Sequence, residues 1–109
     1  MGALVNTRTW RKPPPLESAI ENKFLALAKA AGWRTRKLNG VGARSWPDRL
    51  VLLHNGQFAL IEFKRPQLGV LSAGQEDLFE ELKLLDHHVL VTTDAQKAYD
   101  YCKRIEANT

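Results

Sequence analysis

The stretch from Pro47 to Lys64 constrains the fold of this chain more than any other. It reads PDRLVLLHNGQFALIEFK, two apolar runs that meet at Asn55-Gly56. Asn-Gly between apolar runs is a strong hairpin signal, so the sequence predicts two antiparallel strands here. The second run ends in Glu62 and Lys64, although buried charged groups are costly unless they are paired or bind a metal.

Alternation of side chains across a strand decides whether these charged groups can meet. Glu62 and Lys64 are two residues apart, so both project from one face at the end of the second run. A strict two-residue turn would place Arg49 opposite Glu62 and leave Asp48 out of phase. A three-residue loop, Asn55 to Gln57 with a bulge at its glycine, would place Asp48 opposite Lys64 and on the face of Glu62. We expect that loop, or a bulge elsewhere in the hairpin.

Two carboxylates and an ammonium group would then converge at one end of the hairpin. Such a cluster suits a hard divalent cation that is bound by oxygen atoms and keeps some of its water. The residues alone leave an alternative, a structural pair between Glu62 and Lys64 that closes the strand end.

A helix is predicted over residues 16–31, before the hairpin. Its apolar residues recur at helical spacing, and Gly32 supplies a C-terminal cap. Glu17 and Glu21 lie one turn apart beside the apolar stripe. Two interpretations are open for these acids: favourable placement near the positive end of the helix dipole, or a ligand to the metal or its water.

The remaining elements alternate in type. Strands are predicted over 33–38 and 89–92, and helices over 73–85 and 95–105. Ser72 and Gln75 fit a capping box at the start of the 73–85 helix, which is a complete structural explanation for Gln75. The order α-β-β-β-α-β-α predicts an α/β domain with a mixed sheet flanked by helices.

Pro47-Asp48 followed by Glu62-x-Lys64 resembles the PD-(D/E)xK nuclease signature. With an acidic helix before it and Ser72-x-x-Gln75 after it, this order is similar to that of the virus-type replication-repair nuclease (VRR-NUC) domain, especially its short stand-alone forms. The resemblance covers roughly residues 16–98 and implies a restriction-endonuclease-like core.

The resemblance also implies roles for individual residues. Asp48, Glu62 and the backbone carbonyl of Phe63 would hold Mg²⁺, for which Mn²⁺ would substitute. Lys64 would orient or activate the attacking water and stabilise developing negative charge.

Three further residues of the implied centre lie on the two helices. Gln75 would face the metal and help to position water or the lysine. Glu21 would act through the metal or its water, and archaeal Holliday-junction resolving enzymes look similar at this position. Glu17 also matches the acid of the VRR-NUC helix and is the second candidate.

Basic residues near this centre are candidates for DNA binding. They are Arg34, Arg36, Lys37, Arg44 and Arg65. The net charge of +4 and pI near 9.5 favour an acidic partner, nucleic acid first. On the first strand these charges could equally discourage edge pairing. Trp46 is either a core residue or a platform for a base.

The activity that the resemblance implies is that of a Mg²⁺-dependent, structure-selective DNA endonuclease that leaves a 5′-phosphate. The resemblance favours resolution of four-way (Holliday) junctions, and a homodimer would supply the two active sites that two symmetric incisions need. The alternatives are a nuclease for flaps or nicks, a metal-dependent RNase, and a non-catalytic basic DNA-binding or scaffold protein.

Composition and length set the remaining bounds. The 109 residues predict one domain, 16–109, after an extended basic and proline-rich arm over 1–15. The single cysteine, Cys102, excludes an internal disulfide and fits a reducing compartment. We expect a cytoplasmic protein of a bacterium or phage-infected cell, with no membrane span and no organic cofactor. His87 and His88 are expected at the surface.

Overall fold

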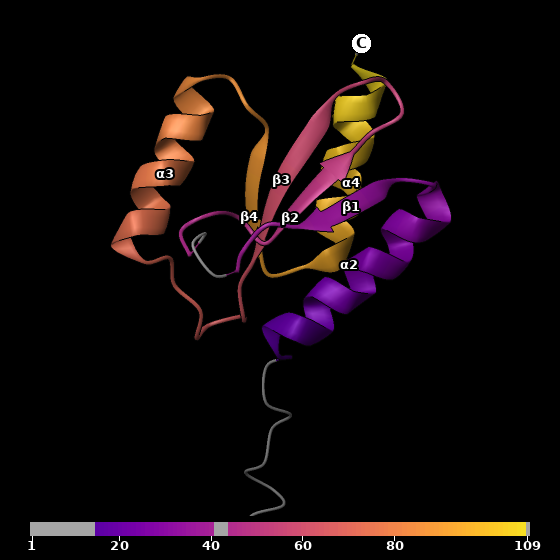
Figure 1. Cartoon of the computed structure of the whole chain (residues 1–109). Coiled ribbons are helices and arrows are strands. Elements are labelled where there is room, and N and C mark those ends of the chain that lie inside the picture. Colours follow the sequence, from indigo (N-terminus) through magenta and orange to yellow (C-terminus); the bar gives the residue numbers. More distant parts are fainter. Residues whose placement is uncertain (1–14, 41–43, 109) are drawn as a thin grey trace, which may run out of the picture.

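A four-stranded mixed sheet with helices on both faces forms the body of the molecule (Figure 1). The computed structural model describes residues 15–40 and 44–108. In chain order the elements are α2 (Glu17–Ala31), β1 (Arg34–Lys37), β2 (Arg49–Leu52), β3 (Phe58–Phe63), α3 (Ala73–Leu84), β4 (Val89–Thr92) and α4 (Ala95–Ala107). The strand order is β1-β2-β3-β4, antiparallel except for the parallel pair β3–β4. The predicted order α-β-β-β-α-β-α and the predicted mixed sheet are confirmed.

The β2–β3 hairpin turns one residue earlier than predicted. Leu53 N–H donates to the Gln57 carbonyl at 3.0 Å, so the three-residue loop is 54–56 and not 55–57. Gly56 has φ of +82°, the left-handed conformation that ends such a loop, and its N–H reaches the Leu53 carbonyl at 3.4 Å.

This turn sets the register of the strands that carry the charged residues. Leu50 pairs with Leu60 and Arg49 with Ile61, so the ladder continues with Asp48 opposite Glu62. The expectation that Asp48 lies opposite Lys64 was wrong by two residues. Because side chains alternate with a period of two, that error leaves Asp48 on the predicted face.

Strand β3 is buried on both of its faces. Helices α2 and α4 cover one face, where the rings of Phe24 and Phe63 pack 5.5 Å apart and neither residue is exposed. Helix α3 covers the other face through Phe79 and Leu82, which pack on Leu60. A strand covered on both sides reads as a continuous apolar run, which explains the sequence FALIEF.

Local signals position the helix ends that adjoin the sheet. Gly32 ends α2 in the left-handed conformation, with φ of +82°. Asp94 caps α4 by accepting from the backbone N–H groups of Gln96 and Lys97 at 2.8 and 3.3 Å. Cys102 is fully buried on α4, and burial raises the pKa of its thiol to about 12, as suits a core residue rather than a nucleophile.

The predicted N-terminal arm, residues 1–15, lies outside the described residues except for Pro15, and its boundary with the domain remains a prediction. In the part of the chain that the structure describes, no helix is long and apolar enough to cross a bilayer. His87 is exposed and stacks on the ring of Phe58, whereas His88 is half-buried and bonds to Gln57 at 2.9 Å.

Candidate active site

The beginning of β2 and the end of β3 bring two carboxylates together. The backbone N–H of Asp48 donates to Glu62 Oε1 at 3.1 Å, and Asp48 Oδ2 accepts from the backbone N–H of Phe63 at 2.8 Å. Asp48 is 8% exposed and Glu62 is 2% exposed. The antiparallel register therefore holds two acids against one another in a place where water is largely excluded.

Lys64 completes the predicted trio. Its Nζ lies 3.1 Å from Glu62 Oε2, and its backbone N–H donates to the Thr92 carbonyl of β4 at 2.9 Å. The loop after it folds back tightly, because a Cβ at Gly69 would lie 2.8 Å from the Arg65 backbone nitrogen and 3.1 Å from Lys64 Cβ. Glycine is thus required where this loop closes on the lysine.

Gln75 performs two tasks with one amide. Its Oε1 accepts from the backbone N–H of Ser72 at 3.1 Å, and its backbone N–H donates to Ser72 Oγ at 3.2 Å, which completes the predicted capping box. With the oxygen held by the cap, Nε2 donates to Glu62 Oε2 at 3.1 Å. The start of α3 therefore presents a fixed donor to the candidate centre.

Negative charge dominates the electrostatics of this cluster. Burial raises the pKa of Glu62 to about 7, helped by the charge of Asp48 and opposed by Lys64 and Gln75. Burial also raises the pKa of Asp48, with further repulsion from Glu21 and Glu17, although the Phe63 N–H and Lys64 favour the ionised form. A bound cation would offset this repulsion, so the residues present fit a divalent metal with oxygen ligands.

Asn39 is a site residue that the sequence interpretation missed. Its Nδ2 donates to Asp48 Oδ1, while its own Oδ1 is buried and has no hydrogen-bond partner among the described residues. Its backbone neighbour Leu38 extends the β1–β2 ladder by donating to the Asp48 carbonyl at 2.9 Å. The available signal was an amide directly after the strand that pairs beside Asp48.

Replacement of Asn39 by alanine is expected to weaken metal binding about 10- to 100-fold, the usual effect of losing a partner that orients a ligand. The measurement is the shift of the thermal midpoint with Mn²⁺ concentration, which requires no substrate. Asn22→Ala, an exposed change on α2, is the control. An unchanged Mn²⁺ dependence in Asn39→Ala would show that Asn39 has no part in holding Asp48.

Among the described residues neither helix acid is hydrogen-bonded to the carboxylate pair, although the charges of both raise the pKa of Asp48. Glu21 Oε2 bonds to Arg49 Nε at 2.5 Å, and Glu17 is exposed in the first turn of α2. Within residues 15–40 and 44–108, no three His, Cys, Asp or Glu side chains are grouped so as to hold a metal. The structure thus assembles Asp48 with Glu62, and the ligand roles of Glu21, Glu17 and the Phe63 carbonyl stay predictions.

The predicted DNA-binding residues lie mostly in the open. Arg34, Arg36 and Lys37 are exposed on β1, the strand at one edge of the sheet. Arg44 is exposed, and Arg65 is half-buried in the loop after β3. Trp46 is 41% exposed two residues before Asp48, so its interpretation as a core residue was wrong.

Two buried carboxylates, a lysine and an amide donor lie together at one end of the sheet, and these groups suit a divalent metal and its water. Among solved structures, one described as a VRR_NUC domain matches this structure with a TM-score of 0.68 and 26% sequence identity. The match covers 85% of this chain and 97% of that chain. No protein-family model and no curated protein matches the chain.

The chain therefore has the fold of a VRR_NUC domain, which confirms the predicted resemblance and the predicted α/β architecture. The name of that domain denotes a nuclease.

Proposed function

We propose that this protein is a metal-dependent DNA endonuclease that hydrolyses phosphodiesters. The observation that carries the proposal is the convergence of Asp48, Glu62 and Lys64, with Lys64 Nζ 3.1 Å from Glu62 Oε2 and Asp48 N 3.1 Å from Glu62 Oε1. Burying two acids side by side raises the pKa of Glu62 to about 7. Ionisation of this pair destabilises the folded protein unless a bound ligand offsets the charge, and such perturbed groups are typical of functional sites.

Mg²⁺, with Mn²⁺ as a substitute, is the proposed ion. Asp48, Glu62 and the Phe63 carbonyl would hold it, with Glu21 or Glu17 acting through water. When bound, a divalent cation lowers the pKa of its water and shields the charge of the phosphodiester.

The remaining residues position the attacking water and the carboxylates and stabilise the charge that develops on the phosphate. Lys64 orients the attacking water and stabilises the negative charge that grows on the phosphate oxygens as water attacks. Gln75 keeps the Glu62 carboxylate in place by donating to Oε2 at 3.1 Å, while Asn39 does the same for Asp48 Oδ1. No side-chain nucleophile is needed, since water forms the new P–O bond while the bond from phosphorus to the 3′ oxygen breaks and leaves a 3′-hydroxyl.

Branched DNA, and the four-way junction in particular, is the proposed substrate. The exposed Arg34, Arg36 and Lys37 on β1 suit phosphate contacts, which read shape rather than sequence. A homodimer would supply the two centres that symmetric incision of a junction needs. A nuclease for flaps or nicks is the second candidate.

The exposed indole of Trp46 suits stacking on a base that branched DNA leaves unstacked next to the scissile phosphate. Trp46→Ala is expected to raise the Kd for a junction about tenfold, while the Kd for continuous duplex changes little. Fluorescence anisotropy in Ca²⁺ measures both constants. Leu52→Ala, at a residue 45% exposed, is the control for loss of surface apolar area. Equal losses on junction and duplex would contradict base stacking.

Incubation of labelled junction, flap, duplex and RNA substrates with Mg²⁺ or EDTA tests the proposed function. Cleavage is expected with Mg²⁺ alone and on the branched DNA first. Lys64→Ala is expected to lose it, whereas Lys83→Ala on α3 is the control. Binding of junctions without cleavage at any Mg²⁺ or Mn²⁺ concentration would favour a scaffold and refute the enzyme.

A further inference from the structure

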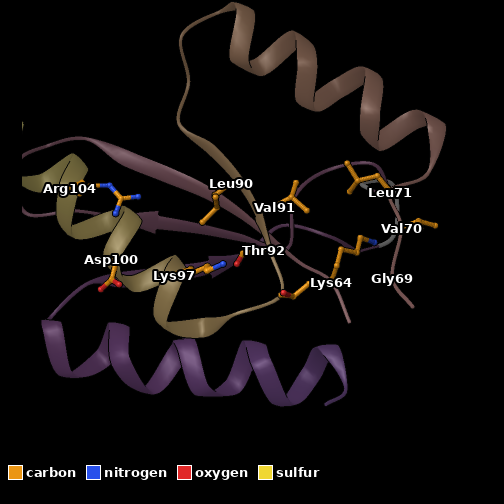
Figure 2. A pocket seen from close by; sticks show the side chains of 11 residues that line it. Lys64, Gly69, Val70, Leu71, Leu90, Val91, Thr92, Lys97, Asp100 and Arg104 are labelled. Carbon is orange, nitrogen blue, oxygen red and sulfur yellow. The ribbon is translucent and has the colours of Figure 1, made fainter. Parts of the chain in front are cut away.

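A groove of about 610 Å³ has Lys64 near one end and Arg104 near the other (Figure 2). Its walls are the loop after β3, strand β4 and helix α4. Strand β4 is the edge of the sheet opposite β1, so the groove lies on the far side of the centre from Arg34, Arg36 and Lys37. Nothing in the proposed mechanism uses this groove apart from Lys64 itself.

Helix α4 presents two cations to the groove. Lys97 and Arg104 are seven residues apart, so they share one face of α4 about 10 Å from each other. Both are exposed, and neither forms an ion pair within residues 15–40 and 44–108. Asp100 lies between them in the sequence and accepts from Gln96 Nε2 at 3.0 Å. Two cations and one carboxylate give this wall a net positive charge.

The loop opposite α4 contributes the apolar side chains Val70 and Leu71, whereas the floor on β4 mixes Leu90 and Val91 with Thr92 and Thr93. Val70 is 80% exposed and Val91 is 36% exposed, and both line the groove with Gly69 beside them. Cations along one wall and apolar side chains along the other match the sugar–phosphate backbone, which offers charge on one side and deoxyribose on the other.

We propose that this groove binds the DNA strand on one side of the scissile phosphate, with Lys97 and Arg104 on two of its phosphates. A distance of about 10 Å corresponds to roughly three phosphates of one strand along a duplex. The basic β1 edge would hold DNA on the other side of the centre, so substrate would extend both ways from it, as the arms of a branched molecule do. This inference rests on the proposed function, because the groove begins at the proposed catalytic lysine.

The open edge of β4 could instead accept an extended peptide, but the cations favour DNA. Among the described residues neither cation has an ion-pair partner, both line the groove, and a polyanion supplies negative charge at regular intervals. Binding of an acidic peptide in this groove would therefore overturn the proposal.

The test is the affinity of the full chain for a labelled four-way junction, measured in Ca²⁺ across a series of salt concentrations. The double variant Lys97→Ala/Arg104→Ala is expected to raise the Kd about tenfold. The slope of log K against log salt should fall by about 2, because each lost phosphate contact removes roughly 0.9. The matched control is Lys83→Ala/Lys103→Ala, which removes the same charge from exposed positions that do not line the groove.

If the control variant shows the same changes in Kd and salt slope as Lys97→Ala/Arg104→Ala, net charge alone is responsible and the proposal is overturned. An unchanged salt slope in Lys97→Ala/Arg104→Ala would overturn the proposal as well. So would polyglutamate that displaces the junction from the wild-type protein but not from the double variant, because the groove would then bind an acidic peptide. Failure of the proposed function looks different: the wild-type protein would not cleave DNA in Mg²⁺, whatever the affinities.

Discussion

Asp48→Asn is expected to abolish cleavage and, at the same time, to stabilise the metal-free protein. The fall in cleavage rate should be at least about 10³-fold, since the change removes one of the two carboxylates that are proposed to hold the ion. Without metal the ionised Asp48 is unfavourable, because burial and the nearby acids Glu21 and Glu17 raise its pKa. A neutral side chain of the same shape removes this repulsion and also relieves Glu62.

The hydrogen bonds around Asp48 can accept the change. An asparagine oxygen can replace Oδ2 and accept from the Phe63 N–H, now 2.8 Å away. The new amide can donate to Asn39 Oδ1, which has no partner now, once the Asn39 amide turns over. Asn39 Nδ2 then takes the buried position in which Oδ1 has no partner now, so one unsatisfied group replaces another. Removal of the charge repulsion should therefore raise stability by about 1 kcal/mol, or roughly 4 °C in Tm for a domain of this size.

Thermal unfolding in EDTA at pH 8 and single-turnover cleavage in Mg²⁺ measure the two effects. Asp77→Asn, an exposed change on α3, alters net charge by the same amount and should leave both unchanged. An Asp48→Asn protein that still cleaves, or that is less stable than wild type in EDTA, would contradict this account of the pair.

Stability of the metal-free protein is expected to fall as pH rises from 5 to about 7.5. The pKa of Glu62 in the folded protein, about 7, exceeds its ordinary value of 4.5. Between these values the folded state holds a proton that the unfolded state has released, so raising the pH favours unfolding. The raised pKa of Asp48 acts in the same direction. The lowered pKa of Glu106 has the opposite effect, but only below pH 4.5.

The size of this loss of stability follows from the rise in the pKa of Glu62. From 4.5 to about 7, at about 1.4 kcal/mol per pH unit, it corresponds to about 3 kcal/mol, or of order 10 °C in Tm. If Mg²⁺ binds the ionised carboxylates as proposed, saturating Mg²⁺ should stabilise most at high pH and reverse the trend.

Thermal midpoints from pH 5 to 8, in EDTA and in Mg²⁺, provide the measurement. Glu62→Gln should flatten the EDTA curve and remove the response to Mg²⁺, whereas Glu80→Gln, exposed on α3, should behave as wild type. A wild-type midpoint in EDTA that rises steadily with pH would mean that burial does not raise the pKa values of these carboxyl groups.

Local patterns in the sequence predicted most of the fold because each element carries its own signal. Gly32, the Ser72–Gln75 box and Asp94 fix helix ends through contacts within a few residues, and the structure has each of them. The face shared by Asp48 and Glu62 was also predictable, since it depends only on whether the hairpin loop has an odd number of residues.

Contacts between distant segments were not predictable in the same way. The exact turn residues depend on which carbonyl accepts from the Leu53 N–H, and the choice of Gln57 places Asp48 opposite Glu62 rather than Lys64. The bond from Asn39 to Asp48 depends on the path of a loop, and the pair of Glu21 with Arg49 depends on how α2 packs on the sheet. Likewise, nothing local to Trp46 decides whether its indole is covered.

A crystal soaked in Mn²⁺ tests the central claim most directly, because anomalous scattering locates the ion without reference to activity. The account predicts a Mn²⁺ ion held by carboxylate oxygens of both Asp48 and Glu62, with Lys64 Nζ beside it. An ordered, ion-free carboxylate pair at saturating Mn²⁺ would contradict it, as would an ion bound only at residues elsewhere in the chain.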